Sequence, residues 1–177
     1  TMSCPQTVSV EGGEVEQTTE LAEGWNWWCT YIETNGIDAL GMLEEGLGNN
    51  ATSIKSQSSG YSDYYEGYGW FGTLSEINNE SHYRITMNDA STVTLSGTVA
   101  NPSAHPITIN PGANWIGYVS ASPMDINEAL AGMAASSGDM VKTQQSYAEY
   151  YPGYGWYGSL STLQPGMGLL YTSANSG

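Results

Sequence analysis

Apolar and polar positions in the first half of the chain follow two different periods. Residues 25–32 are aromatic and β-branched without a helical break, which predicts a buried strand. Over residues 35–47 the apolar side chains recur near the helical period, which predicts a short amphipathic helix that Asn35 caps and Gly48 ends. Shorter alternating runs predict three further strands, at residues 53–57, from residue 70 and at 83–87.

The same order of elements returns in the second half. Residues 114–119 predict a strand, and Asp125 caps a helix over residues 126–133 that is closed by Gly138. Three strands follow, at residues 140–144, from residue 156 and at 169–172. The remaining segments are predicted as a short strand at 7–10, a connecting strand at 91–99 and a turn-rich joint at 101–106.

An internal repeat underlies this similarity. Residues 65–75 read YEGYGWFGTLS and residues 151–161 read YPGYGWYGSLS, with eight of eleven positions identical. The segments GWNWW and IKSQ likewise return as GANWI and VKTQ, in the same order. We therefore predict an α+β, β-rich fold of two fused β-α-β-β-β pseudo-repeats that share one core, since a half of about 85 residues is small for independent folding. The divisions are an N-terminal arm at 1–23, repeat 1 at 24–100 and repeat 2 at 101–177.

These motifs also resemble a known sequence family. The order GWNWW, a helix with an Ala-Leu pair, IKSQ, GWFG and GANWIGY, with a second round ending in PGMGLLYTS, is similar to a tandem Trp-rich repeat module of secreted and surface proteins of gut Bacteroidetes. The resemblance covers about residues 21–173. The resemblance implies an exported protein with flanking domains. It identifies no catalytic residue in this chain, because the family has no established activity. Cys29 and Ala113 depart from its pattern.

Composition and charge limit the classes of partner that the protein can bind. Eighteen carboxylates and three cations give a net charge of -15 over 177 residues, which argues against nucleic acid and anionic membranes. No apolar run reaches the length of about 18 residues that membrane insertion requires. The low charged fraction and abundant glycine are typical of extracellular β-rich chains, so we predict a secreted or cell-surface protein from which any export signal is absent.

The two cysteines allow either one disulfide or two free thiols. Cys4 and Cys29 have no spacing typical of a metal site or a redox motif. Cys29 belongs to the first repeat only, where the second has Gly117, and Cys4 lies in the preceding arm. We predict a Cys4 to Cys29 bridge that fixes this arm, with two free thiols as the alternative.

Tyrosine-rich segments are the first candidate for a binding site. Residues 58–69 and 145–155 are dense in Tyr, Gly and Ser and are predicted as loops. Together with the predicted strand that starts at residue 156, they hold nine of the thirteen tyrosines. Tyrosine offers a large rigid contact area and a hydroxyl at little cost in entropy. The predicted ligand contacts are Trp70, Trp156, Tyr65, Tyr68, Tyr151 and Tyr154. The alternative is that these tyrosines only cover the core, where Trp25, Trp27, Trp28 and Trp115 are also expected.

The lysines are the second candidate. Lys55 and Lys142, the only two in the chain, occupy the same repeat position, each two residues before a glutamine, Gln57 or Gln144. Side chains two residues apart on a strand share a face, so we predict a polar face that hydrogen-bonds a neutral ligand. The alternative is a lysine stem packed on Trp70 or Trp156 with its ammonium group paired to a carboxylate.

Signals for catalysis are weak. His82 and His105 occupy non-equivalent positions, and no Gly-x-Ser-x-Gly motif or zinc-ligand spacing occurs. Calcium at Asp63 with Glu66, or at Glu149, would lack an EF-type loop, so no cofactor is predicted. We predict a non-catalytic binding or adhesion module, with a neutral glycan as the first ligand class and exposed, coplanar rings to bind it. The alternatives are a structural spacer that displays another domain and an adhesin that binds a surface protein.

Overall fold

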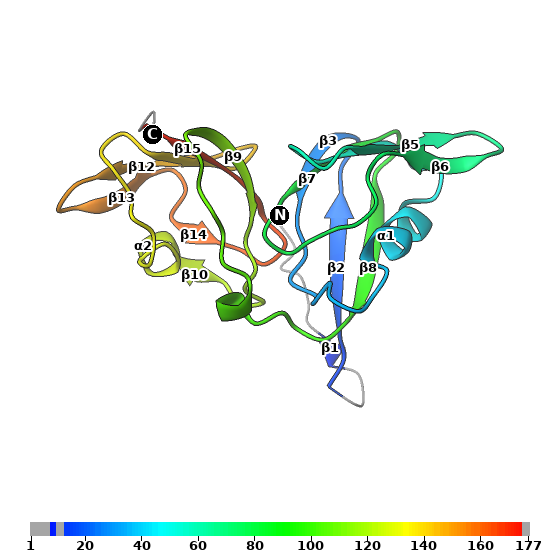
Figure 1. Ribbon diagram of the computed structural model, residues 1–177, viewed down its shortest axis with the longest axis horizontal. Coiled ribbons are helices and arrows are strands. Elements are labelled where there is room, and N and C mark those ends of the chain that lie inside the picture. Colours follow the sequence, from blue (N-terminus) through cyan, green and yellow to red (C-terminus); the bar gives the residue numbers. More distant parts are fainter. Residues whose placement is uncertain (1–7, 10–12, 175–177) are drawn as a thin grey trace.

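The computed structural model describes residues 8–9 and 13–174, which form two halves that lie side by side (Figure 1). Each half contains one five-stranded antiparallel sheet, and two smaller sheets complete the fold. Two short α-helices and the 3-10 turn η1 (Pro102–Ala104) are the helical elements of this part of the chain. The prediction of a β-rich α+β chain arranged in two halves is confirmed.

The first half is a two-layer structure. Its five-stranded sheet has the order β3-β7-β4-β5-β6, formed by β3 (Gly24–Trp28), β7 (Tyr83–Met87), β4 (Ala51–Lys55), β5 (Tyr61–Tyr65) and β6 (Gly69–Gly72). Beneath it lie helix α1 (Ala39–Leu47) and a sheet of β1 (Val8–Ser9), β2 (Val15–Leu21) and β8 (Ser91–Gly97) (Figure 1). The upper face of the five-stranded sheet is thereby left to solvent.

The second half repeats this arrangement with a thinner lower layer. Its sheet has the order β13-β12-β11-β15-β9, formed by β9 (Gly112–Gly117), β15 (Gly168–Ser173), β11 (Met140–Lys142), β12 (Tyr147–Tyr151) and β13 (Gly155–Gly158). Beneath it lie α2 (Ile126–Ala129) and the pair β10 (Met124–Asp125) and β14 (Thr162–Leu163) (Figure 1). In each five-stranded sheet the two strands nearest the other half are the first and last of that sheet in the sequence, β3 and β7 in one and β9 and β15 in the other.

The tyrosine-rich segments differ from the prediction, because they are strands and not loops. β5 and β12 pair with β6 and β13 as hairpins, which gives each half one strand more than predicted. Tyrosine favours extended backbone, and the turns close through Gly67 and Gly153, whose φ angles of 80° and 81° suit a glycine at the third position of a type II turn. The tyrosines are therefore held at fixed register.

The helix boundaries also differ from the prediction. Asp38, not Asn35, caps α1, because its carboxylate accepts a hydrogen bond from the Gly41 N–H at 2.9 Å. Asp125 caps α2 as predicted, but that helix ends after four residues, so Gly138 lies well beyond it. Gly48, with a φ of 53°, does end α1.

The buried side chains form two clusters, so the predicted single shared core is wrong. The first cluster lies between the first sheet and α1 with β2 and β8, and includes Trp28, Leu43 and Ile85. The second lies under the other sheet and includes Trp156 and Tyr171. Each half has its own lower layer and buries its own apolar face, which removes the need for a common interior.

The repeated Gly-x-Asn-Trp motif has a structural role. The Asn26 side chain accepts from the Ala22 N–H at 3.0 Å and donates to the Ala22 carbonyl at 2.7 Å. Asn114 bonds in the same way to both backbone groups of Asn110, at 2.8 Å each. In each half the asparagine thus closes the turn that leads into the strand next to the other half.

Candidate functional site

A glutamine side chain of the first half bonds to the edge of the second sheet. The Gln57 amide donates to the Ala113 carbonyl at 2.6 Å and accepts from the Trp115 N–H at 2.8 Å. Both backbone groups belong to β9, an edge strand of its sheet. An unpaired strand edge exposes such groups to other chains, and here one side-chain amide occupies them as a paired strand would.

Gln144 makes the reciprocal contact. Its amide donates to the Trp25 carbonyl at 2.7 Å and accepts from the Trp27 N–H at 2.9 Å, both on the edge strand β3. We call the two contacts the glutamine clamps. The predicted role of Gln57 and Gln144 in binding a neutral ligand does not fit this geometry, because both amides are already bonded within the protein. The repeated Gln instead joins the halves.

At the junction, two indole rings enclose the side chains of Arg84 in β7 and of His82, the residue just before this strand. The His82 ring stacks on Trp27 at 5.2 Å and on Trp115 at 5.1 Å, with interplanar angles of 11° and 2°. The guanidinium carbon of Arg84 lies 4.6 Å from the Trp27 ring centre and 3.8 Å from that of Trp115. Each half contributes one indole, so this aromatic stack also crosses the junction.

His82 is a neutral member of the stack. Burial, with a smaller effect of the Arg84 charge, lowers the pKa of His82 to about 4. Its Nδ1 lies 2.7 Å from the Leu169 carbonyl, which makes Nδ1 the donor and leaves Nε2 to accept from the Arg84 Nε at 3.5 Å. The positive charge of the stack therefore belongs to Arg84.

Strand register places this stack in a row of side chains on the upper face. Trp27 opposes Arg84, Arg84 opposes Lys55, and Lys55 opposes Tyr61. We call this the Arg84 row. In the second half the equivalent row runs through Trp115, Leu170, Lys142 and Tyr147, and we call it the Leu170 row. Residues directly opposed across strands share a face of the sheet.

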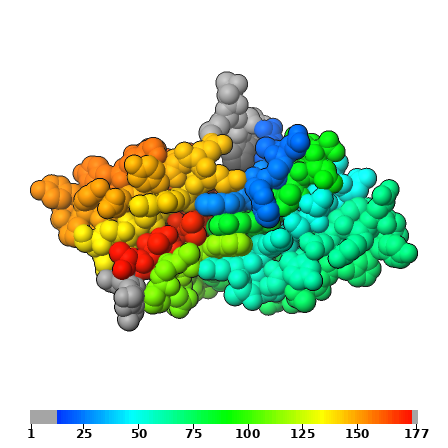
Figure 2. Space-filling model, turned by 90° about the horizontal axis from the view of Figure 1, so that it is seen from above, coloured from blue at the N-terminus to red at the C-terminus, as the bar shows by residue number. Residues whose placement is uncertain are grey.

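Exposed aromatic side chains gather on this upper face and at its two ends. Figure 2 views the face from above, with blue, green and lime segments meeting at the junction of the halves. The exposed aromatic residues are Trp25, Tyr61, Tyr65, Tyr68 and Phe71 in the first half and Tyr147, Tyr151, Tyr154 and Tyr157 in the second. An exposed aromatic surface of this extent, mixed with polar side chains, is typical of a binding face.

All three cations of the chain lie on the same face. Lys55 and Arg84 belong to the Arg84 row and Lys142 to the Leu170 row. The Lys55 ammonium lies 5.6 Å from the Trp25 ring centre rather than on Trp70, which corrects the predicted packing partner. Across residues 13–174 the ion pairs within 4.0 Å involve only His105, so no described carboxylate pairs with these cations.

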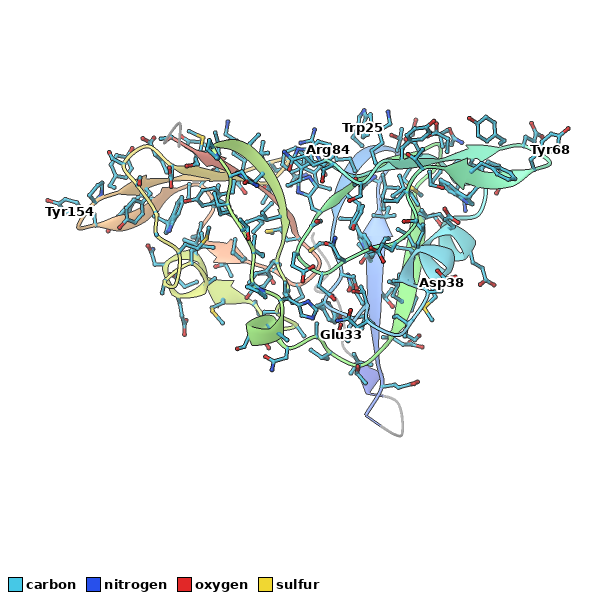
Figure 3. The ribbon with its side chains drawn as sticks, viewed as in Figure 1. Trp25, Glu33, Asp38, Tyr68, Arg84 and Tyr154 are labelled. Carbon is cyan, nitrogen blue, oxygen red and sulfur yellow. The ribbon has the colours of Figure 1, made fainter. Side chains whose placement is uncertain are left out.

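Six of the predicted ligand contacts are accessible. Tyr68 and Tyr154, 81% and 78% exposed, mark the two far ends of the molecule, and Trp25 and Arg84 lie near the top between them (Figure 3). The other accessible members are exposed on the upper face, namely Tyr65, Tyr151, Lys55 and Lys142.

Trp70 and Trp156 face the opposite way. Trp156 is 4% exposed and packs against Tyr150 and Tyr171 in the second cluster, while Trp70 is partly buried against the first. Neither indole is exposed on the upper face, so the ligand contacts expected of Trp70 and Trp156 stay a prediction that their burial does not favour. Their neighbours on the opposite face, Phe71 and Tyr157, are the exposed rings of these strands.

The exposed rings of the hairpins are not coplanar. Tyr65 and Phe71 meet at an interplanar angle of 58°, and Tyr151 and Tyr157 at 64°. The near-parallel rings are those of Trp27 and Trp115, whose inner faces His82 and Arg84 occupy. The expectation of exposed rings is met, and that of coplanar rings is not.

The sequence interpretation missed the central part of this face. Trp25, expected in the core, is 51% exposed, and Trp27 and Trp115 are partly buried at the junction, which leaves Trp28 as the core residue of that group. Arg84 was available as a signal, because it is the sole arginine and alternates with the apolar Tyr83 and Ile85. Alternation alone places it on the face opposite the core.

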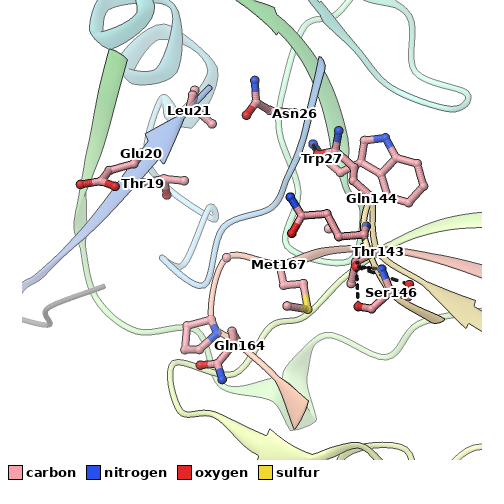
Figure 4. Close-up of a pocket in the computed structure, with 14 residues that line it drawn as sticks. Thr19, Glu20, Leu21, Asn26, Trp27, Thr143, Gln144, Ser146, Gln164 and Met167 are labelled. Atoms are coloured by element: carbon pink, nitrogen blue, oxygen red, sulfur yellow. Dashed lines mark hydrogen bonds between the residues drawn. The ribbon is translucent and has the colours of Figure 1, made fainter. Parts of the chain in front are cut away.

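A hollow of about 510 Å³ opens beside Trp27, where the halves meet (Figure 4). Its walls come from β2, the turn at residues 143–146 and the segment 164–168, and include Thr19, Met167 and Gln164. Its polar groups are already bonded in part: the Gln144 amide forms a clamp, and the Thr143 and Ser146 hydroxyls lie 2.8 Å apart. Because β2 belongs to the layer beneath the first sheet and no exposed aromatic side chain lines the hollow, it is separate from the aromatic surface of the upper face.

Cys29 is a free, fully buried cysteine at the junction. Its Sγ lies 3.2 Å from the Met167 carbonyl and 3.7 Å from the Tyr118 carbonyl, and burial raises the pKa of its thiol to about 12. Cys4, the other half of the predicted disulfide, lies outside the described residues. The bridge therefore stays a prediction.

His105 anchors the joint between the halves. Its Nε2 lies 2.9 Å from a Glu33 carboxylate oxygen and its Nδ1 lies 2.8 Å from one of Glu80. Hydrogen bonding to Glu33, and then to Glu80, raises the pKa of His105, and the same bond from His105 is the main cause of the lowered pKa of Glu33. Both ring nitrogens donate, so the imidazole is cationic.

We expect the His105→Gln substitution to reduce stability in a pH-dependent way. Because its pKa is raised, His105 contributes to the free energy of unfolding. This contribution is complete below the ordinary pKa of 6.5 and is lost as pH rises through the raised pKa. Glu33, whose pKa is lowered, contributes stability that is present above its ordinary pKa of 4.5 and is lost as pH falls through the lowered pKa. The difference in unfolding free energy between the native protein and the variant should be largest between these values.

Urea unfolding at about pH 5.5 and about pH 9.5 tests this, with a smaller difference expected at the higher pH. His82 is present in both proteins, so its own titration cancels. A difference that does not change between the two pH values would contradict the role of the ion pairs.

Comparisons with models of known protein families, with curated proteins and with solved structures find no match. Over residues 8–9 and 13–174, no group of three or more His, Cys, Asp or Glu side chains is placed to hold a metal ion. No helix in this described part is long and apolar enough to cross a membrane. A function must therefore be inferred from the chemistry of the upper face.

Proposed function

We propose that the chain is a non-catalytic binding module that uses its upper face to bind a glycan. The observation that carries the proposal is the collection of nine exposed aromatic side chains on this face and at its ends. Apolar faces of sugars stack on aromatic rings, while hydroxyl and amino groups bond the sugar hydroxyls, and the same mixture is typical of small-ligand sites. Besides its rings, the upper face provides tyrosine hydroxyls, Lys55, Lys142 and the threonines Thr86 and Thr172.

The two halves are, in this proposal, fused copies of one repeat unit. The equal order of their strands, the reciprocal clamps and the equivalent asparagine turns support this. Composition and the resemblance noted above favour a secreted or cell-surface protein with flanking domains. Two copies also give two similar hairpin ends for one extended ligand.

We expect Tyr154→Ala to weaken glycan binding about thirtyfold, because truncating an aromatic side chain that stacks on the ligand costs about 2 kcal/mol. Its melting temperature should stay nearly unchanged, since the side chain is 78% exposed. An array of neutral glycans would identify the ligand, and titration calorimetry would measure the loss. Met42→Ala is the matched control, because Met42 is also exposed but belongs to α1 beneath the sheet.

Loss of thermal stability without a change in affinity would show that the tyrosines only cover the core, which favours the structural spacer. If the variant is stably folded and binds with normal affinity, the hairpin ends do not contact the ligand. The Tyr68→Ala variant tests the equivalent end of the first half.

Binding to a surface protein is the second candidate, and the tilted ring pairs favour it. Rings at 58° and 64° to their neighbours present edges as well as faces, which suits an irregular protein surface better than a flat sugar. An array without glycan hits, followed by saturable binding to a defined surface protein that Tyr154→Ala abolishes, would support this candidate.

A further inference from the structure

We propose that Arg84 and Lys55 form a subsite for one carboxylate of an acidic sugar residue within an otherwise neutral glycan. This inference rests on the proposed glycan-binding function and adds the chemical class of the ligand. It depends on the Arg84 row, the aromatic stack and the distribution of charge over the chain.

The first argument is the position of the two cations. Lys55 and Arg84 are directly opposed on neighbouring strands, although like charges in such pairs are destabilising. The chain has eighteen carboxylates that could neutralise them, yet within residues 13–174 none lies within ion-pair distance of either. Two unneutralised, adjacent cations in an acidic protein are matched by an external anion.

The second argument is the geometry around Arg84. The indoles of Trp27 and Trp115 cover the guanidinium group from two sides, with ring centres 4.6 Å and 3.8 Å from its central carbon. In the described chain its Nε bonds weakly to His82, and its two terminal nitrogens have no hydrogen-bond partner. A guanidinium edge binds a planar carboxylate through two parallel hydrogen bonds. A sulfate group on a sugar carries the same negative charge as a carboxylate, but it is tetrahedral and not planar.

The third argument concerns the number of charges. The net charge of -15 repels a polyanion as a whole, while the local pair of cations attracts one negative group. A glycan with an isolated sialic or glucuronic acid satisfies both conditions. Its neutral sugars would contact the aromatic rings on either side of the row, including Trp25, over which the Lys55 ammonium lies.

The repeat supplies an internal control. Lys142 is the equivalent of Lys55, but the residue opposed to it is Leu170 instead of an arginine. The lysine position alone therefore does not make the subsite. Lys55→Gln and Lys142→Gln remove the same charge from equivalent exposed positions, and only the first change disturbs a pair of cations.

The test uses the full chain and an array of matched oligosaccharides. Each set contains one neutral glycan, the same glycan with a single sialic or glucuronic acid, and the same glycan with a single sulfate. We expect the native protein to bind the carboxylated member at least about tenfold more tightly than the neutral one, equivalent to about 1.4 kcal/mol. Lys55→Gln and Arg84→Gln should remove this preference, and Lys142→Gln should retain it.

Each other outcome has a definite meaning. Equal binding of neutral and carboxylated members would overturn the subsite while leaving the glycan-binding proposal in place. A preference for the sulfated member would overturn the carboxylate assignment, and an equal loss of preference in Lys142→Gln would overturn the Arg84 pair. No binding to any member would overturn both proposals. Lys55→Gln keeps the test decisive if Arg84→Gln unfolds the junction.

Discussion

Replacement of Trp156 by alanine is expected to lower the free energy of unfolding by about 3 to 5 kcal/mol, the range for loss of a buried large aromatic side chain. Trp156 is 4% exposed and contacts the rings of Tyr150 and Tyr171 beneath the second sheet. The cavity left by the indole would be lined by these rings. Small proteins have only about 5 to 15 kcal/mol of stability, so the variant should be partly unfolded at physiological temperature.

The adjacent residue is the matched control. Tyr157 points to the upper face, is 57% exposed and meets Tyr151 only edge to face. Tyr157→Ala should cost less than about 1 kcal/mol. Denaturant unfolding of the two variants measures the difference, and equal losses would contradict the assignment of these neighbours to opposite faces of β13.

Gly117→Ala is expected to destabilise the protein by about 3 kcal/mol, at the upper end of the range for overpacking. A Cβ atom at this position would lie 2.5 Å from the Asn79 carbonyl oxygen, 3.0 Å from that of Ser81 and 3.2 Å from the Cys29 Cβ. The first two are backbone atoms, and the Gly117 N–H is itself bonded to Glu80 at 2.9 Å. The added methyl group must therefore move one half away from the other.

Gly132→Ala provides the comparison, because a Cβ there meets no atom within 4 Å. That variant should be neutral or slightly stabilising, by up to about 1 kcal/mol, as fewer unfolded conformations remain. Calorimetric melting of both variants tests the pair. A Gly117→Ala protein with native stability would show that the halves do not need their close approach.

The repeat predicted the architecture because its signals are local. Alternation in residues 83–87 placed β7 correctly, and Asp125 was recognised as a cap because capping depends on a few adjacent residues. The extra strands β5 and β12 were missed, since Tyr, Gly and Ser are common in loops as well as hairpins. The two separate cores were missed because sequence does not reveal that each half has a lower layer of its own.

The candidate site was predicted only in part, because a strand exposes two faces and sequence spacing does not say which is buried. Tyr65, Tyr151 and both lysines were placed on the accessible face, while Trp156 belongs to the other. Gln57 and Gln144 each lie two residues beyond the end of a strand. Gln57 bonds to Trp115, 58 residues away in the sequence, and Gln144 bonds to Trp27, 117 residues away. Such long-range pairing cannot be predicted from local periodicity.

The glutamine clamps have a further consequence for assembly. Every clamp joins one half to the other, and the connection between them passes through a single joint at residues 101–106. A half from a second molecule would present the same strand edge and receive the same two bonds, so the contacts do not distinguish a closed monomer from an exchanged dimer. We expect the length of the joint, which His105 anchors, to set the balance between the two forms, and a shorter joint to favour the domain-swapped dimer.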